Sequence, residues 1–277
     1  MFFEHNIFSR SSLLDIPGIS HGFSSRIGGV STLPHTASLN LSCGLGDEDE
    51  TVFRNLDIFA QSLSDGVYSG ADTVTAHQIH SAKVRILTSA NAGEGCTLPR
   101  GEDCDGFVTD QPGVLPIIRV ADCVPILLAG VKSDTSAVIA AVHAGWRGTV
   151  SGITAEAVRL MCSLGCTLSS IRAAIGPHIG FCCYEVSEDF IESVSELRGH
   201  EFALRHIRKI PGKTKHHADL TSMNLEIFAD AGVPVGQIDI HPGCTMCRPD
   251  LYYSHRASGG RRGVMGGGIC ILPNKDA

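Results

Sequence analysis

The chain has 277 residues, of which 43% are hydrophobic, and a net charge of −7 at pH 7, which favours a protein with a large core and argues against a nucleic-acid surface. No apolar run is long enough to span a membrane, and residues 1–12 carry an early acid and no continuous apolar region, so we expect neither a membrane anchor nor a secretory signal. The eleven cysteines are therefore expected to be reduced thiols in a cytoplasmic protein.

The N-terminal part of the chain combines a glycine turn with a helix. Gly28 and Gly29 predict a turn that lets the backbone approach another group closely. Arg26 beside this turn could hold an anion, although a solvated arginine in a surface loop is the favoured interpretation. An acidic run at 46–50 then precedes apolar residues at helical spacing, which predicts a helix with acids at its N-terminal end. The apolar residues are Val52, Leu56, Phe59 and Leu63.

A histidine pair comes next, His77 and His80, at the edge of a strand expected over Ala82–Leu87. Residues 89–104 contain glycine, asparagine and proline and predict a long loop. Two further strands are expected over 105–109 and 114–120.

The middle of the chain holds two short apolar runs, Val124–Ala129 and Ala137–Val142, which predict neighbouring buried strands. Cys123 precedes the first run and His143 follows the second. A thiolate and an imidazole at the ends of neighbouring strands are good ligands for zinc, and a third ligand is expected in His77–His80. Either residue alone is more often inert core or a satisfied polar group, so the prediction depends on the three segments together.

A glycine turn and a helix follow the second run. The helix is predicted to begin after Gly148 and to end at Gly165. Free N–H groups at its start, near Thr149, would form an anion site, and Arg147 is placed to hold a phosphate there. Close packing alone also explains such a turn. The apolar side of the helix comprises Ile153, Val158, Met161 and Leu164.

The second half of the chain predicts a strand over Ile171–Ile175, a helix capped by Ser187, a helix over Asp219–Ala231, and strands over 238–240 and 269–272. The polar segment 198–218 between the helices is expected to be a mobile excursion. Its histidines are expected to be exposed and not to act as ligands: His206, His216 and His217.

Four cysteines in this half are possible metal ligands by residue type. Cys182 and Cys183 are adjacent, and on a strand their side chains would face opposite sides, so we do not expect them to share a metal. Cys244 and Cys247 have zinc-like spacing, but no second pair stands at the spacing of a zinc ribbon. Two reduced thiols in a turn are the favoured interpretation of this pair.

Several motifs in one order over nearly the whole chain resemble the YfiH-like, laccase-domain family. The motifs are HGFSSRIGGVS, SLNL, HQIHSAKV, DGFVTD, VADCVP, VHAGWRG, AIGPHIGFCCYEV, a helix with Asn224, and YYSHR. The resemblance implies a single α/β domain over residues 1–277, built as a layered sandwich with mixed β-sheets flanked by helices. It also implies a zinc site whose ligands and catalytic residues are His80, Cys123 and His143, the three residues already singled out by their chemistry and placement.

The activity that the resemblance implies is that of a purine nucleoside phosphorylase, acting on adenosine, inosine or methylthioadenosine with phosphate, together with adenosine deaminase activity. Three protein ligands leave zinc a fourth position, as in catalytic sites. The candidate substrate-binding residues are Arg26, Asn40 and Arg147, and Asp122 or His77 is the candidate proton carrier. We expect small-molecule partners only, and a monomer.

The chain departs from the family pattern at three places. Ser81 stands where a glycine is usual, and His178 stands where a cysteine is common. The C-terminal arginine motif is altered to His255-Arg256 and Arg261-Arg262-Gly263. These departures spare the expected metal ligands but affect the tail's contribution to substrate contacts.

Other functions use the same residues. The family's older description implies a copper-dependent polyphenol oxidase, but the several His-x-His pairs that such an enzyme needs are not found in the sequence. A cysteine hydrolase, or a factor that edits peptidoglycan precursors, would use Cys123 as nucleophile and His143 as base without a metal. A binding protein without enzymatic activity is the least economical alternative. Metal analysis separates zinc enzyme, copper oxidase and hydrolase.

Overall fold

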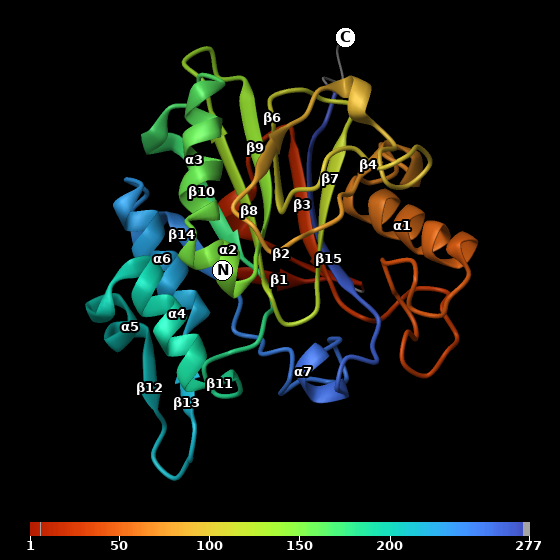
Figure 1. Cartoon of the computed structure of the whole chain (residues 1–277). Helices are drawn as coiled ribbons and strands as arrows, with labels where there is room; N and C mark the ends of the chain where they lie inside the picture. Colours follow the sequence, from red (N-terminus) through yellow and green to blue (C-terminus); the bar gives the residue numbers. More distant parts are fainter. Residues whose placement is uncertain (6, 274–277) are drawn as a thin grey trace.

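Two six-stranded mixed sheets form the centre of the computed structural model, which describes residues 1–5 and 7–273 (Figure 1). In the first sheet the strand order is β1 (Phe2–Glu4), β2 (Phe8–Ser11), β3 (Ile19–Ser24), β15 (Met265–Ile271), β7 (Leu115–Val120), β4 (Thr73–Val74). In the second sheet it is β14 (Ile238–Ile240), β10 (Arg172–Ile175), β8 (Val124–Val131), β9 (Ala137–Ala144), β6 (Gly106–Thr109), β5 (Val84–Ile86). A small third sheet has the order β11 (Glu185–Val186), β13 (His216–Ala218), β12 (Ile207–Lys209).

Helices cover both outer faces of the paired sheets. Figure 1 shows α1 on one side of the sheets and α3 and α6 on the other. The helices are α1 (Asp49–Leu63), α2 (Trp146–Val150), α3 (Ile153–Ser163), α4 (Glu188–Arg198), α5 (His200–His206), α6 (Leu220–Asp230) and α7 (His255–Ser258). None of the helices in the described part of the chain combines the length and apolar character needed to cross a membrane.

The layers follow from apolar residues on both faces of the central strands. Ile126 and Leu128 of β8 pack in the cluster beneath α3 and α6, whereas Leu127 and Ala129 pack between the two sheets. Successive residues of a strand face opposite sides, so a continuous apolar run is buried on both faces. The predicted layered sandwich with mixed sheets and flanking helices is therefore confirmed.

The glycine run in β15 explains how closely the first sheet is packed. A Cβ atom on Gly266 would lie 2.8 Å from the Leu41 side chain, and one on Gly268 would lie 3.2 Å from Phe59 and Leu63 of α1. The strand that we expected over 269–272 therefore begins earlier, at Met265, because the glycines lie inside the sheet and not in a loop.

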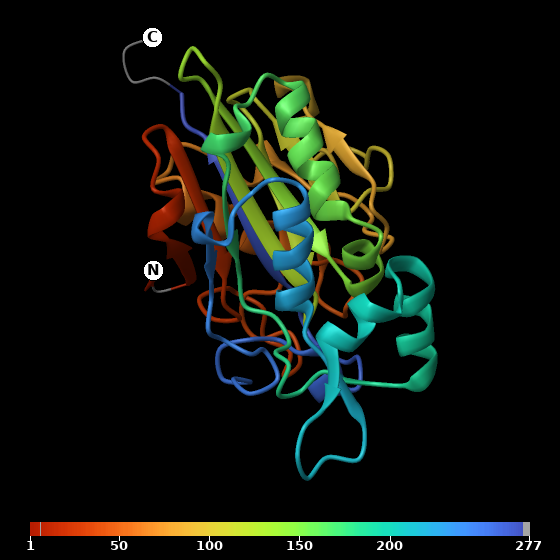
Figure 2. The same cartoon turned by 90° about the vertical axis from the view of Figure 1, so that its left-hand side faces the viewer.

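Two sequence predictions about helices and loops were wrong. The helix expected after Gly148 begins at Trp146 as the short α2, and Gly152, at φ 84°, separates it from α3. The segment 198–218 is not an excursion, because it forms α5 and the hairpin of β12 and β13 that projects in Figure 2. His206 and His217 are buried there, where His206 contacts Glu226 at 2.8 Å and His217 contacts the carbonyl of Phe181 at 2.8 Å.

A buried histidine between β2 and β3 makes the stability of the fold depend on pH. The Ser11 backbone N–H donates to Nε2 of His21 at 3.0 Å, so the ring must stay neutral to accept this bond. Burial, with a contribution from Arg10, lowers the pKa of His21 from 6.5 to about 4. Between these two values the unfolded chain binds more protons than the folded chain, so stability falls as the pH falls.

We therefore expect the free energy of unfolding to decrease by about 3 kcal/mol between pH 6.5 and pH 4 through His21 alone, at roughly 1.4 kcal/mol per pKa unit. Denaturant unfolding at several pH values measures this loss. The variant His21→Gln cannot titrate and should show a shallower decrease over the same range. An identical decrease in both proteins would contradict the assignment.

Candidate active site

The hairpin of β8 and β9 places two of the predicted ligands together. The strands pair antiparallel with His143 opposite Pro125, so Cys123, just before β8, lies beside His143. His80 comes from the loop between β4 and β5, where its φ of 59° turns the chain toward the hairpin. Its Nε2 lies 3.8 Å from the Cys123 sulfur, and the ligand atoms of all three residues lie within 4.8 Å of one another. The structure thus brings together the three residues that the sequence singled out.

Asp105 orients two of these residues from behind. Its carboxylate lies 2.8 Å from Nδ1 of His143 and accepts the backbone N–H groups of His80 at 2.9 Å and Ser81 at 2.7 Å. The Ser81 hydroxyl donates a further bond to the same carboxylate at 2.8 Å. A carboxylate on one ring nitrogen leaves Nε2 of His143 as the atom that can face a metal.

The charges of this cluster support one another. Burial would raise the pKa of Asp105, but hydrogen bonds from His143 and Ser81 outweigh burial and hold the pKa at about 2. Burial would also raise the pKa of the Cys123 thiol, but His143 and His80 lower it below its usual range. The site therefore favours a thiolate, which is the form that binds metals and also the form that acts as a nucleophile.

Gly145 in the VHAGWRG segment leaves the space that the side chains of His80, Cys123 and His143 occupy. A Cβ atom at this position would lie 2.7 Å from Cδ2 of His80 and 3.4 Å from the Cys123 sulfur. Any side chain here would displace His80 from the other two residues. Close approach, and not a special backbone angle, accounts for this glycine, since its φ is −61°.

The three residues line a pocket of about 540 Å³. Its lining comes from segments that lie far apart in the sequence: β7, the histidine loop, residues 179–184 and residues 255–264. The pocket is large enough for a small molecule. Its lining residues include Ser42, His77, Gln78, Val120, Ile179, Tyr184, His255 and Val264.

Three arginines that the sequence analysis did not choose also line this pocket: Arg119, Arg256 and Arg262. Burial lowers the pKa of Arg119 to about 10, and its guanidinium donates to the Ala76 carbonyl at 2.6 Å. Arg262 is half-buried, but its Nε atom is fully buried, and no group among the described residues accepts a hydrogen bond from it. A buried guanidinium donor without a partner is suited to bind an anion.

The residues predicted to bind substrate lie elsewhere. Arg26 donates to the backbone carbonyls of Ala37 and Pro249 and stacks on Tyr253, 4.6 Å from the ring centre. Asn40 is buried and donates to Asp47 at 2.9 Å. Neither residue lines the pocket.

Arg147 stacks on Trp146, 4.3 Å from the ring centre, and lines a second hollow of about 340 Å³. Tyr184 and Arg256 lie between this hollow and the first pocket, since they line both. The anion site expected at Thr149 is not available, because the Thr149 N–H donates to the Gly145 carbonyl at 2.8 Å. The residue is buried in α2 and not free at a helix start.

The two candidate proton carriers differ in their surroundings. Both carboxylate oxygens of Asp122 accept hydrogen bonds, from the Thr245 hydroxyl at 2.6 Å and from the Arg256 backbone N–H at 2.7 Å. His77 lies at the pocket mouth and is 61% exposed, with Asp103 at 3.3 Å. His77 is therefore open to solvent, whereas Asp122 links residues 245 and 256.

Cys182 and Cys183 are not arranged as the sequence analysis assumed. They lie in a turn and not on a strand, and their sulfur atoms lie close to those of Cys244 and Cys247. His178, the residue in place of a cysteine, is not part of this group, since its ring contacts Gly176 and Thr221.

The chain is similar to a family model, to named proteins and to solved structures over most of its length. The family model described as multi-copper polyphenol oxidoreductase laccase matches residues 20–272. Purine nucleoside phosphorylase YlmD of Geobacillus stearothermophilus is 33% identical over 253 residues, which cover 90% of this chain and 88% of that protein. A protein of an unknown prokaryotic organism, adenosine deaminase RL5, is 32% identical over 191 residues, which cover 68% of this chain and 71% of that protein. The crystal structure of Bacillus licheniformis hypothetical protein YfiH matches with a TM-score of 0.86 and 28% identity over 98% of both chains.

Proposed function

The chain belongs to the multi-copper polyphenol oxidoreductase laccase family, and from this premise we propose that it is a zinc-dependent purine nucleoside phosphorylase with adenosine deaminase activity. The names of its relatives support an enzyme that acts on purine nucleosides. The observation that carries the proposal is the arrangement of three ligand atoms within 4.8 Å of one another in a pocket that also holds three arginines.

The residues fit zinc. A tetrahedral ion with bonds of about 2.0–2.3 Å places its ligand atoms roughly 3.3–3.8 Å apart. Cys123 and His80 meet this condition at 3.8 Å, and Asp105 behind His143 is the partner that zinc-bound histidines usually have. We propose His80, Cys123 and His143 as the ligands. When bound, zinc supplies a concentrated positive charge that polarises a substrate or lowers the pKa of water.

The protein's own groups account for the rest of the chemistry. In phosphorolysis, phosphate attacks C1′ of the nucleoside, the glycosidic bond breaks, and the electron pair leaves with the base. Arg262, with Arg119 and Arg256 beside it, is the proposed holder of the phosphate. The leaving base needs a proton, and His77 at the pocket mouth is placed to donate it. In deamination, water replaces the 6-amino group, which leaves as ammonia.

Two assays test the proposal. Adenosine or inosine incubated with phosphate should give the free base and ribose 1-phosphate, and base release should stop when phosphate is omitted. Adenosine without phosphate should give inosine and ammonia. Chromatography detects all these products. Absence of both reactions in zinc-loaded protein would overturn the proposal.

A cysteine hydrolase is a second candidate. In space, His143 lies between Asp105 and Cys123, as the base of a hydrolase lies between its acid and its nucleophile. This reaction needs no metal. A polyphenol oxidase is favoured only by the family description. In the described part of the chain two groups could hold a metal, and only one contains histidine, whereas a full multicopper centre needs many histidines.

A further inference from the structure

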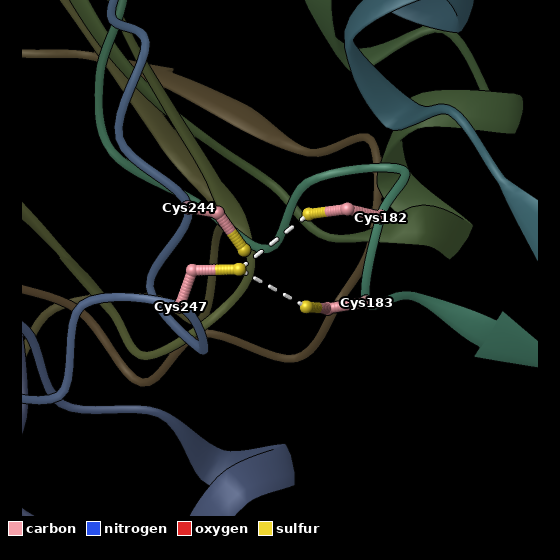
Figure 3. A group of neighbouring side chains, drawn as sticks. All are labelled: Cys182, Cys183, Cys244 and Cys247. Carbon is pink, nitrogen blue, oxygen red and sulfur yellow. Dashed lines mark hydrogen bonds between the residues drawn. The ribbon is translucent and has the colours of Figure 1, made fainter.

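Four cysteine side chains converge at the surface next to the pocket (Figure 3). The Cys247 sulfur lies 3.7 Å from that of Cys182 and 3.4 Å from that of Cys183. With Cys244, all four sulfur atoms lie within 4.8 Å of one another. Figure 3 shows the side chains pointing inward from two chain segments toward one point.

We propose that these four cysteines bind one zinc ion as a structural centre, separate from the site of His80, Cys123 and His143. A tetrahedral zinc with Zn–S bonds of about 2.3 Å places its sulfur atoms roughly 3.8 Å apart. The separations of Cys247 from Cys182 and Cys183 are close to this value, and four thiolates in tetrahedral arrangement select zinc over harder cations.

The fold brings the two cysteine pairs together although they are far apart in the chain. Strands β10 and β14 pair in parallel, so the segments that leave them run side by side. A bridge continues this pairing from His178 to Cys244, and the Thr245 N–H donates to the His178 carbonyl at 3.0 Å. The segment after β10 then turns back through Cys182 and Cys183, toward the Cys244 loop.

The turns themselves are suited to thiolates. The Gly180 backbone N–H donates to the Cys244 sulfur at 3.2 Å, as backbone amides do to metal-bound sulfur. A side chain at Gly180 would crowd the cluster, because its Cβ would lie 3.3 Å from the Cys182 sulfur. Binding forms four Zn–S bonds and releases the four thiol protons, with no change of oxidation state, and leaves a centre of net charge −2.

The centre would fix one wall of the pocket. The first cysteine segment carries Ile179 and Tyr184, which line the pocket, and the second carries Thr245, which donates to Asp122 next to Cys123. Removing the ion would loosen both segments. The inference concerns a second site and does not depend on the proposed enzymatic function.

Zinc content of the full chain tests the centre. In the variant Cys123→Ala, which removes one ligand of the first site, elemental analysis after purification without chelator should find about one zinc per chain. Adding Cys244→Ser and Cys247→Ser should remove it. Adding Cys162→Ser instead should leave the zinc in place, because Cys162 is a partly buried cysteine of α3 outside both groups. Equal zinc with and without Cys244 and Cys247 would overturn the proposal.

A second readout avoids variants that fail to fold. The Cys123→Ala chain, stripped by chelator and confirmed as folded by circular dichroism, is titrated with Co²⁺. We expect saturation near one equivalent, with the strong thiolate-to-cobalt absorption of several sulfur ligands, and displacement by Zn²⁺ with a rise in Tm. Absence of this absorption in reduced, folded protein would reject the centre, as would a Cys183–Cys247 disulfide found by mass mapping of protein purified under reducing conditions.

Discussion

Replacing Cys123 with alanine is expected to lower kcat/KM for phosphorolysis by at least about a hundredfold, because even outer partners of metal ligands cost ten- to a hundredfold when they are removed. The zinc content should fall by about one ion per chain, with the four-cysteine centre still occupied. Steady-state kinetics and elemental analysis of the same preparations measure both effects.

The matched control is Cys162→Ala, which removes a cysteine of α3 that does not line the pocket. It should keep the zinc content and the activity. Activity lost in Cys123→Ala with an unchanged zinc content would assign Cys123 a role other than metal binding. Activity near that of the unchanged protein would remove Cys123 from the mechanism.

Replacing Arg262 with alanine is expected to raise KM for phosphate by about tenfold to over a hundredfold, with a much smaller change in KM for the nucleoside. A hydrogen bond to a charged ligand contributes roughly 1.5–3 kcal/mol, which corresponds to this range. The unpartnered buried Nε of Arg262 is the reason for choosing it over the other arginines of the pocket.

Arg147→Ala is the comparison, since Arg147 was the residue that the sequence favoured for phosphate. It lies in the adjoining hollow and stacks on Trp146, so its removal should leave KM for phosphate nearly unchanged. A larger increase in Arg147→Ala than in Arg262→Ala would move the phosphate to that hollow, on the far side of Tyr184 and Arg256.

The parts of the fold that could be predicted are those with local signals. The strands β8 and β9 could be predicted because burial on both faces gives a continuous apolar run. The helix α1 could be predicted because burial on one face gives apolar residues at helical spacing. Cys123 and His143 could be placed together for the same reason, since they stand next to strands that pair in a hairpin.

Features made by distant segments left no such signal. Asp105 stands directly before an ordinary strand, β6, and only the folded chain shows that it holds His143 and the His80 loop. Arg262 reaches the pocket from the C-terminal tail. The four cysteines failed the spacing rule for zinc ribbons because parallel pairing of β10 and β14, and not a short loop, brings them together.

Arg26 and Asn40, two of the predicted substrate-binding residues, do not line the pocket. Their motifs suggested substrate contacts, but their side chains are used to hold loops: Arg26 on the carbonyls of Ala37 and Pro249, and Asn40 on Asp47. Polar side chains that satisfy buried backbone groups look the same in a sequence as those that bind ligands.

The most direct test of the account asks whether Cys123 is a metal ligand or a free nucleophile. Zinc-loaded protein is treated with an alkylating reagent, with and without prior removal of zinc by a chelator, and the labelled peptides are mapped by mass spectrometry. The same measurement on His143→Ala separates the two roles further, because a lost ligand weakens zinc binding whereas a lost base weakens the nucleophile.

We predict that Cys123 resists alkylation in the zinc-loaded protein, reacts after zinc is removed, and reacts faster in His143→Ala. Rapid labelling of Cys123 in the zinc-loaded protein, slowed by His143→Ala, would contradict the zinc site and favour the hydrolase.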